Sequence, residues 1–183
     1  MKVKKKKLKH CYKNYKMLTE YWPFKKFYKT KVDILDQEKD QLKYLLYKFN
    51  SIKHSVDKDQ TTTYKSINVL NLPRLKNLRN QIIKIIESKN LILGNNWAQL
   101  YLKGSQMSPH LHNNSSYGGI IYVDGDSAEG TSFIDSYSGH THTEKFEKNT
   151  LILFPANIIH FVKYQEQDTR RIVIAFNTVG KVY

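Results

Sequence analysis

The feature that most constrains this chain is a change of hydrophobic period near residue 91. Before it, apolar residues recur every three to four positions; after it, the pattern changes to a period of two, as on β-strands. Turn-forming sequences such as Asp124-Gly125-Asp126 and Ser138-Gly139 separate the alternating runs. We therefore predict a series of short strands, over residues 96–103, 118–123, 131–134, 143–146, 150–154, 161–164 and 171–178.

Two amphipathic helices are predicted before this change, over residues 36–51 and 72–89. We expect Asp36 to be the N-cap of the first helix, and Pro73 lies in the first turn of the second, where proline is tolerated. The apolar positions at helical spacing are Leu42, Leu45, Leu46 and Phe49 in the first helix and Leu75, Leu78, Ile82, Ile85 and Ile86 in the second.

The order of these elements predicts the fold class. A short strand is expected over residues 31–35, and residues 51–68 are expected to form a loop with one edge strand. Two helices followed by many short strands are typical of a mainly β protein with some α structure. We predict a double-stranded β-helix, which is a jelly roll or cupin-like barrel, with the N-terminal helices packed on one sheet.

The positive charge is concentrated at the N-terminus. The chain has a formal net charge of +14, and residues 1–31 contain 12 lysines but only one acidic residue, Glu20. We therefore divide the chain into a basic arm, 1–31, and a single domain, 32–183, with its barrel from about residue 91. The arm either is solvated or contacts an anionic partner. Aromatic residues that we expect to dock it on the domain are Tyr12, Tyr15, Tyr21, Trp22, Phe24, Phe27 and Tyr28.

The cysteine content and the hydropathy of the chain limit the cellular compartment that we expect for it. Cys11 is the single cysteine, so no internal disulfide framework is expected and a reducing environment is the default. The lysine-rich start is not followed by an apolar segment, and no apolar run is long enough to cross a membrane. We therefore expect a cytoplasmic protein without a membrane partner.

Three histidines form the main candidate site. His110 and His112 stand two positions apart before a predicted strand, and such residues project from the same face of a strand. His160 follows the predicted strand 150–154 and a turn that begins at Pro155. Imidazole is a good ligand for iron and other transition metals. We predict a metal site formed by His110, His112 and His160.

Other clusters of polar residues are weaker candidates for a metal site. His140 and His142 form a second pair at the same spacing, but they follow Ser138-Gly139, and we expect them in an exposed loop. Several acidic residues also lie in turn-like surroundings that favour hairpin formation over metal binding. These acidic residues are Asp124, Asp126, Glu129 and Asp135.

An ordered set of short motifs in the second half carries a family resemblance. The motifs are Trp97, His110-Leu111-His112, the run 118–122, Phe154-Pro155, His160, and Arg171 through Phe176-Asn177. In order and spacing they resemble the Fe(II)/2-oxoglutarate-dependent oxygenase superfamily, in particular its small bacterial and phage members. The resemblance covers about the last 90 residues, and it implies the cytoplasm of a bacterial or phage-infected cell.

This resemblance implies an activity and a site. The protein would be a dioxygenase, a hydroxylase that couples decarboxylation of 2-oxoglutarate to oxidation of a C–H bond by O2, with ascorbate as an auxiliary reductant. His112 and His160, with His110, would bind Fe(II). Arg171 would bind the distal carboxylate of 2-oxoglutarate, because guanidinium and carboxylate form a bidentate ion pair. Tyr101 and Tyr122 would add hydroxyl contacts to the cosubstrate.

One departure from the superfamily leaves alternatives open. The common triad is His-x-Asp/Glu with a distal His, and His112 occupies the carboxylate position. A cupin-like metalloenzyme that does not use 2-oxoglutarate is one alternative, although the glutamate expected after its His pair is missing from residues 113–117. A non-catalytic jelly-roll binding module with a basic arm is another. The substrate could be a peptide, a nucleic acid or a small molecule, because barrel loops determine it.

Overall fold

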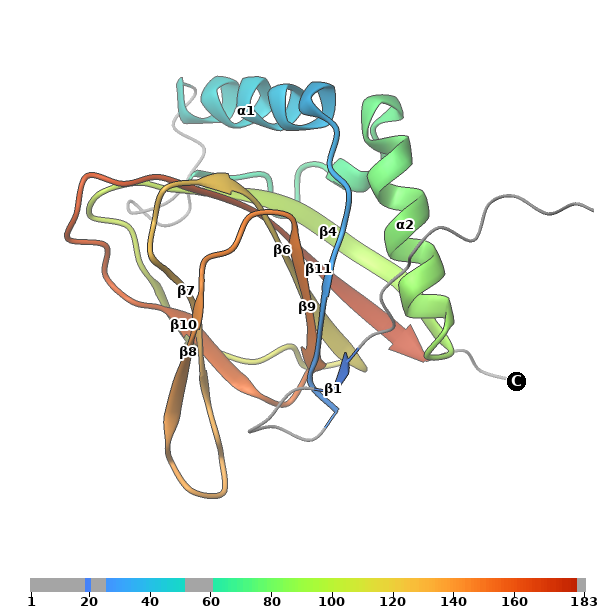
Figure 1. The fold of residues 1–183 in the computed structure, drawn as a ribbon, viewed down its shortest axis with the longest axis vertical. Coiled ribbons are helices and arrows are strands. Elements are labelled where there is room, and N and C mark those ends of the chain that lie inside the picture. The colour runs from blue at the N-terminus through green and yellow to red at the C-terminus, as the bar shows by residue number, and fades with distance from the viewer. Residues whose placement is uncertain (1–18, 21–25, 52–60, 181–183) are drawn as a thin grey trace, which may run out of the picture.

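Two antiparallel β-sheets face each other in the computed structural model, which describes residues 19–20, 26–51 and 61–180 (Figure 1). The larger sheet has the strand order β1-β2-β9-β6-β11-β4-β3, and the smaller one has the order β5-β10-β7-β8. The strands are β1 Thr19–Glu20, β2 Tyr28–Lys31, β3 Thr61–Thr62, β4 Leu91–Tyr101, β5 Met107–His110, β6 Tyr117–Gly125, β7 Glu129–Ile134, β8 Thr141–Lys145, β9 Thr150–Pro155, β10 Ile159–Val162 and β11 Arg171–Gly180.

All the strands predicted after residue 91 are present, with shifted ends. The largest shift is in β4, which begins at Leu91 rather than at residue 96 and pairs with β11 along its whole length. The strand predicted over residues 31–35 is wrong, because β2 ends at Lys31 and residues 32–35 have no regular structure. Strand β5, which contains Pro109, was not predicted.

The two faces of the large sheet contribute to different cores. Along β6, β9 and β11, every second residue packs against the helices; Ile121, Leu151 and Ile174 are examples. The alternate residues point between the two sheets, and Phe133 of β7 packs there against Phe154. This alternation follows from the period-2 geometry of strands. The mainly β prediction with covering helices is therefore confirmed.

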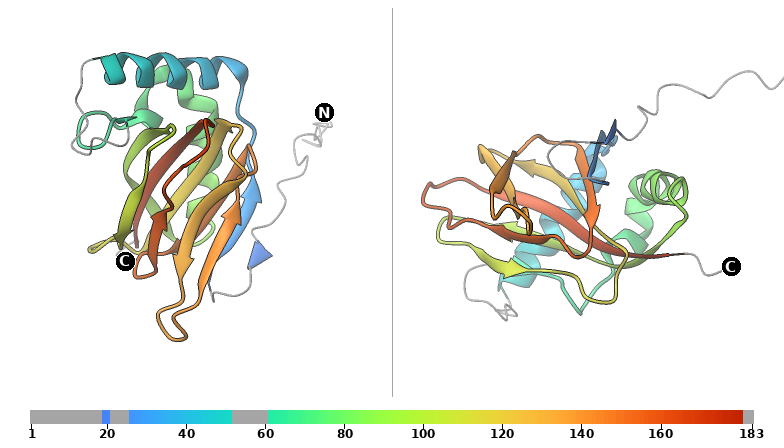
Figure 2. Two further views of the ribbon diagram at one scale, coloured as in Figure 1. Left: turned by 90° about the vertical axis from the view of Figure 1, so that its left-hand side faces the viewer. Right: turned by 90° about the horizontal axis from the view of Figure 1, so that it is seen from below.

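Helices α1 (Asp36–Ser51) and α2 (Lys76–Glu87) lie on the side of the large sheet that faces away from the small sheet (Figures 1 and 2). The bounds predicted for α1 are correct, but Asp36 is its first helical residue rather than its N-cap. The N-cap is Leu35, whose N–H donates to Oε2 of Glu38 at 3.0 Å. Glu38 is fully buried and also accepts the N–H of Leu78 at 2.8 Å, which joins the two helices.

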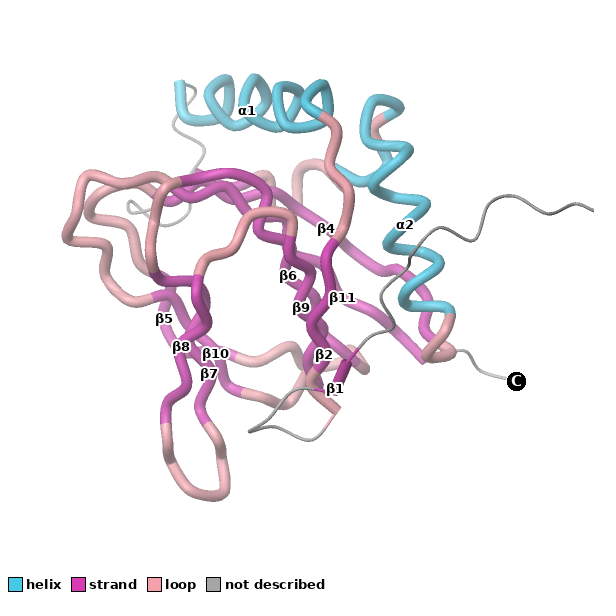
Figure 3. Tube along the Cα trace, viewed as in Figure 1, coloured by secondary structure: helices cyan, strands magenta, loops and turns pink. Residues whose placement is uncertain are grey.

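The second predicted helix is interrupted at its start. Two short 3-10 helices, Val69–Asn71 and Pro73–Leu75, precede α2, so the α-helix begins at Lys76 rather than at residue 72 (Figure 3). Neither helix of the described chain has the length and hydropathy needed to cross a membrane.

Part of the predicted basic arm belongs to the sheet. Strand β2 pairs with β9, and Phe27 is fully buried against Phe133 and Phe154. Tyr28 packs against Tyr117, so two of the aromatic residues expected to dock the arm do so. The other five lie outside the described residues. The folded domain therefore begins before the predicted boundary at residue 32.

Candidate metal centre

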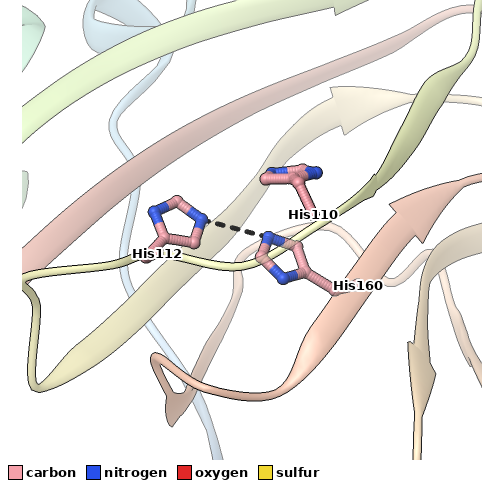
Figure 4. A group of neighbouring side chains, drawn as sticks. All are labelled: His110, His112 and His160. Carbon is pink, nitrogen blue, oxygen red and sulfur yellow. Dashed lines mark hydrogen bonds between the residues drawn. The ribbon is translucent and has the colours of Figure 1, made fainter.

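The three predicted histidines lie together between the sheets (Figure 4). His110 ends β5 and His160 lies in β10, and the two are directly opposite each other in the antiparallel pairing. His112 lies just beyond the end of β5, where its N–H donates to the carbonyl of Ala156 at 2.9 Å. One ring nitrogen from each histidine lies within 4.8 Å of the other two. This is the only such group of three among the residues that the structure describes.

Backbone carbonyls fix the orientation of two imidazoles. Nδ1 of His110 lies 2.8 Å from the carbonyl oxygen of Ser108, and Nδ1 of His160 lies 3.1 Å from that of Ile158. A nitrogen that faces a carbonyl must carry the proton, so the Nε2 atoms of both rings keep their lone pairs. Outer hydrogen bonds of this kind usually orient metal-binding histidines. The local backbone therefore prepares Nε2 ligands.

The third imidazole is near Asn177, whose side chain carries a buried oxygen without a hydrogen-bond partner. Nε2 of His112 lies 3.1 Å from Nε2 of His160 (Figure 4). Asn177 lines the same cavity, and its buried Oδ1 makes no hydrogen bond. If this oxygen accepts a proton on Nδ1 of His112, the Nε2 lone pair of His112 is directed toward His160.

Burial keeps two of the imidazoles neutral. It lowers the pKa of His112 to about 4 and that of His160 to about 3, and the neighbouring His110 lowers both further. The side chain of Asn177 acts in the opposite direction on His112. At neutral pH both rings are therefore neutral, and each has one nitrogen with a lone pair available to a metal.

A cavity of about 700 Å³ opens beside the histidines. Its lining includes Trp97, whose ring stacks on His112 with centroids 6.1 Å apart. Among the described residues the lining contains no aspartate or glutamate, and its two permanent cations are Lys65 and Arg171. A cavity with this charge favours anionic ligands.

Arg171 is the most constrained polar side chain of the cavity. It is 3% exposed, and its NH1 donates to the carbonyls of Glu129 at 2.6 Å and Gly130 at 2.8 Å. Its Nε is buried and has no hydrogen-bond partner. The neighbouring Arg170 points the other way, toward Asp124 at 3.7 Å. Arg171 is thus held at one nitrogen and offers another to a ligand.

The structure brings only one of the two predicted tyrosines into the cavity. The ring of Tyr101 lies 4.9 Å from the guanidinium of Arg171, and its hydroxyl donates to Gln99 at 3.1 Å. Tyr122 is fully buried outside the lining, and its hydroxyl accepts the N–H of Thr131 at 2.8 Å. Burial raises the pKa of Tyr122 to about 12. Tyr122 therefore supports the strand whose carbonyls hold Arg171.

One sequence expectation about a polar residue needs revision, and one polar residue of the cavity was missed. His142 is not in a loop but in β8, where its Nε2 lies 2.9 Å from Oε1 of the buried Glu144. Asn177 was not predicted as a site residue. Its position could have been found from strand periodicity, because alternate residues of β11 share one face. The cavity-lining residues of β11 are Arg171, Val173, Ala175 and Asn177.

Comparison with known proteins rests on solved structures, since no family model and no curated protein sequence matches the chain. A 2OG-Fe(II) oxygenase family oxidoreductase from Burkholderia pseudomallei has a TM-score of 0.55 at 12% identity, covering 76% of this chain and 78% of that one. The viral collagen prolyl hydroxylase of Paramecium bursaria Chlorella virus-1, solved with 2OG, has a TM-score of 0.61 at 13% identity, covering 85% and 96%. This chain has the fold of the 2-oxoglutarate–iron oxygenases.

A third neighbour was solved with a metal and 2-oxoglutarate bound. HygX from Streptomyces hygroscopicus, solved with nickel and 2-oxoglutarate bound, has a TM-score of 0.62 at 10% identity, covering 86% of this chain and 83% of that one. The predicted resemblance to 2-oxoglutarate–Fe(II) oxygenases is therefore confirmed at the level of the fold.

Proposed function

We propose that this protein is an Fe(II)- and 2-oxoglutarate-dependent oxygenase. The observation that carries the proposal is the convergence of one ring nitrogen from each of three histidines beside a cavity that also contains the buried guanidinium of Arg171, whose Nε has no hydrogen-bond partner. The fold and the 2-oxoglutarate bound to two of its structural neighbours support it.

The residues of the cavity fit both Fe(II) and 2-oxoglutarate. His110, His112 and His160 supply three neutral nitrogen ligands, which suit Fe(II), and leave coordination positions open. Arg171 fits the distal carboxylate of 2-oxoglutarate, because a charge-assisted hydrogen bond would satisfy its buried Nε. When bound, iron and 2-oxoglutarate together would supply the oxidising chemistry that no side chain can. The apolar walls of the cavity, such as Phe154 and Val173, exclude water from the reacting atoms.

A three-His metalloenzyme that does not use 2-oxoglutarate is the second candidate. The absence of any carboxylate from the described lining favours it. Three imidazoles add no charge to the metal, whereas a His-x-Asp/Glu triad would add one negative charge. The greater positive charge at the centre would also strengthen the binding of an anionic cosubstrate, so the same observation is compatible with the first candidate.

Anaerobic titration of the Fe(II)-loaded protein with 2-oxoglutarate tests the proposal. Chelation gives a weak visible charge-transfer band, which we expect in the wild type and not in Arg171→Gln. Arg170→Gln is the matched control, because Arg170 lies next in sequence but is directed out of the cavity.

The possible outcomes separate the candidates. A band that persists in Arg171→Gln would contradict the role of Arg171. Iron binding without any band would favour the three-His enzyme that does not use 2-oxoglutarate. Failure to bind iron would contradict both candidates and leave a binding module.

A further inference from the structure

The two cations of the cavity, Lys65 and Arg171, lie beside different positions along strand β4. Arg171 is paired with Tyr101, at the end of β4, whereas the segment before Lys65 packs on Trp97 through Tyr64. Tyr101 is four positions after Trp97, which corresponds to about 13 Å along a strand. Trp97 is also the residue that stacks on His112. The cavity therefore has one cation at the level of Arg171 and a second on the segment that packs at the level of Trp97 and His112.

The loop that carries Lys65 is held firmly against the barrel. Thr63 is fully buried; its N–H donates to the carbonyl of Ala98 at 3.0 Å, and its hydroxyl accepts the N–H of Ala98 at 3.0 Å. The hydroxyl of Thr62 accepts the N–H of Tyr64 at 3.1 Å. These bonds fix the backbone from which Tyr64 and Lys65 project.

Lys65 adopts an unusual backbone conformation. Its φ of 61° lies in the left-handed region, which costs free energy for a residue with a β-carbon. Such conformations occur preferentially where a ligand or a catalytic group must be positioned. Here the conformation places an exposed lysine among the lining residues of the cavity.

Aromatic rings connect this lysine with the metal centre. Nζ of Lys65 lies 5.5 Å from the ring centroid of Tyr64, and the rings of Tyr64 and Trp97 are 4.8 Å apart. The side chain of Tyr64 is nearly half exposed and lines the cavity. Ring faces next to a lysine can bind a flat molecule by stacking and its negative charge by ion pairing.

We propose that the Tyr64–Lys65 corner is the subsite for the primary substrate, and that this substrate is a small molecule with a flat ring and an anionic group. The ring would contact Tyr64 and Trp97, and the phosphate or carboxylate would pair with Lys65. The proposal rests on the proposed function, because it leaves Arg171 to the 2-oxoglutarate. A volume of about 700 Å³ has room for both molecules.

Fluorescence titration of the full-length protein without metal tests this subsite. The chain has two tryptophans, so Trp22→Phe leaves Trp97 as the single reporter. The probes are phenyl phosphate, benzoate and the neutral benzyl alcohol. We expect the anionic probes to change the fluorescence and Lys65→Gln to weaken their binding roughly tenfold or more, as loss of a charge-assisted pair does. Lys89→Gln is the matched control, because Nζ of Lys89 lies 4.1 Å from the Tyr28 ring, outside the cavity lining.

Each outcome bears on the proposal. Binding of phenyl phosphate alone would identify a phosphate monoester as the anion, and binding of both probes would support the shared chemistry. Equal binding of benzyl alcohol, or unchanged affinity in Lys65→Gln, would overturn the subsite. So would loss of phenyl phosphate binding in Arg171→Gln, because the probe would then occupy the cosubstrate position. Failure of the 2-oxoglutarate titration contradicts the proposed function alone, since this assay needs neither iron nor cosubstrate.

Discussion

Nε2 of His112 lies 3.1 Å from Nε2 of His160, and the Nδ1–H of His160 donates to the backbone carbonyl of Ile158. Protonation of either Nε2 would therefore place a charge between buried rings. Burial, together with the neighbouring His110, depresses both pKa values, and for His160 the proximity of His112 adds to the effect. The lowered pKa values make the stability of the metal-free protein depend on pH.

We expect the free energy of unfolding to fall as the pH is lowered from 6.5 to 5. The pKa of His160 is about 3 in the folded protein, against a model-peptide value of 6.5, so the unfolded chain binds a proton first. For His160 alone the loss at pH 5 is about 2 kcal/mol. Urea unfolding at the two pH values measures it, and His160→Gln should reduce the dependence on pH. His140→Gln, at an exposed position, is the control; an unchanged pH dependence in His160→Gln would contradict the assignment.

Tyr122→Phe should destabilise the protein by about 1–3 kcal/mol, because it leaves the buried N–H of Thr131 without an acceptor. The same change should weaken 2-oxoglutarate binding, since Thr131 adjoins the carbonyl of Gly130 that holds Arg171. Urea unfolding and the anaerobic titration measure the two effects. Tyr137→Phe is the control because Tyr137 is 99% exposed. Equal stability of the two variants would show that the Tyr122 hydroxyl has no structural role.

The fold could be predicted wherever sequence period and burial agree. The strands after residue 91 are short, mostly apolar segments, several of them bounded by turn sequences such as Ser138-Gly139, so each could be located from the sequence. Strand β5 could not be found in this way, because it is four residues long, contains Pro109 and has no apolar alternation. Strand β2 was hidden by its lysines, since only Thr30 of its four residues is buried. Its pairing with β9 is a long-range contact that local pattern does not encode.

The metal-binding histidines could be predicted, but the role of each tyrosine could not. His110 and His112 have a local spacing, and His160 has a recognisable turn before it. Tyr101 and Tyr122 both lie in predicted strands, and the sequence does not distinguish their surroundings. Their difference arises because Thr131 of the other sheet covers the Tyr122 hydroxyl. That contact depends on how the two sheets pack together, which the alternation within one strand does not specify.

Asn177→Leu should weaken metal binding by about tenfold to a hundredfold, the usual effect of losing an outer hydrogen-bond partner of a ligand. Leucine has a similar volume but removes the buried Oδ1 that can accept the Nδ1 proton of His112. The remaining tautomer of His112 would then hold a proton where the lone pair is needed. Asn177→Asp keeps the acceptor and should retain affinity. Calorimetric titration with Ni(II) measures the binding, and Asn95→Leu, at an exposed position of β4, is the control. If Asn177→Leu and Asn95→Leu bind the metal equally well, Asn177 does not orient His112.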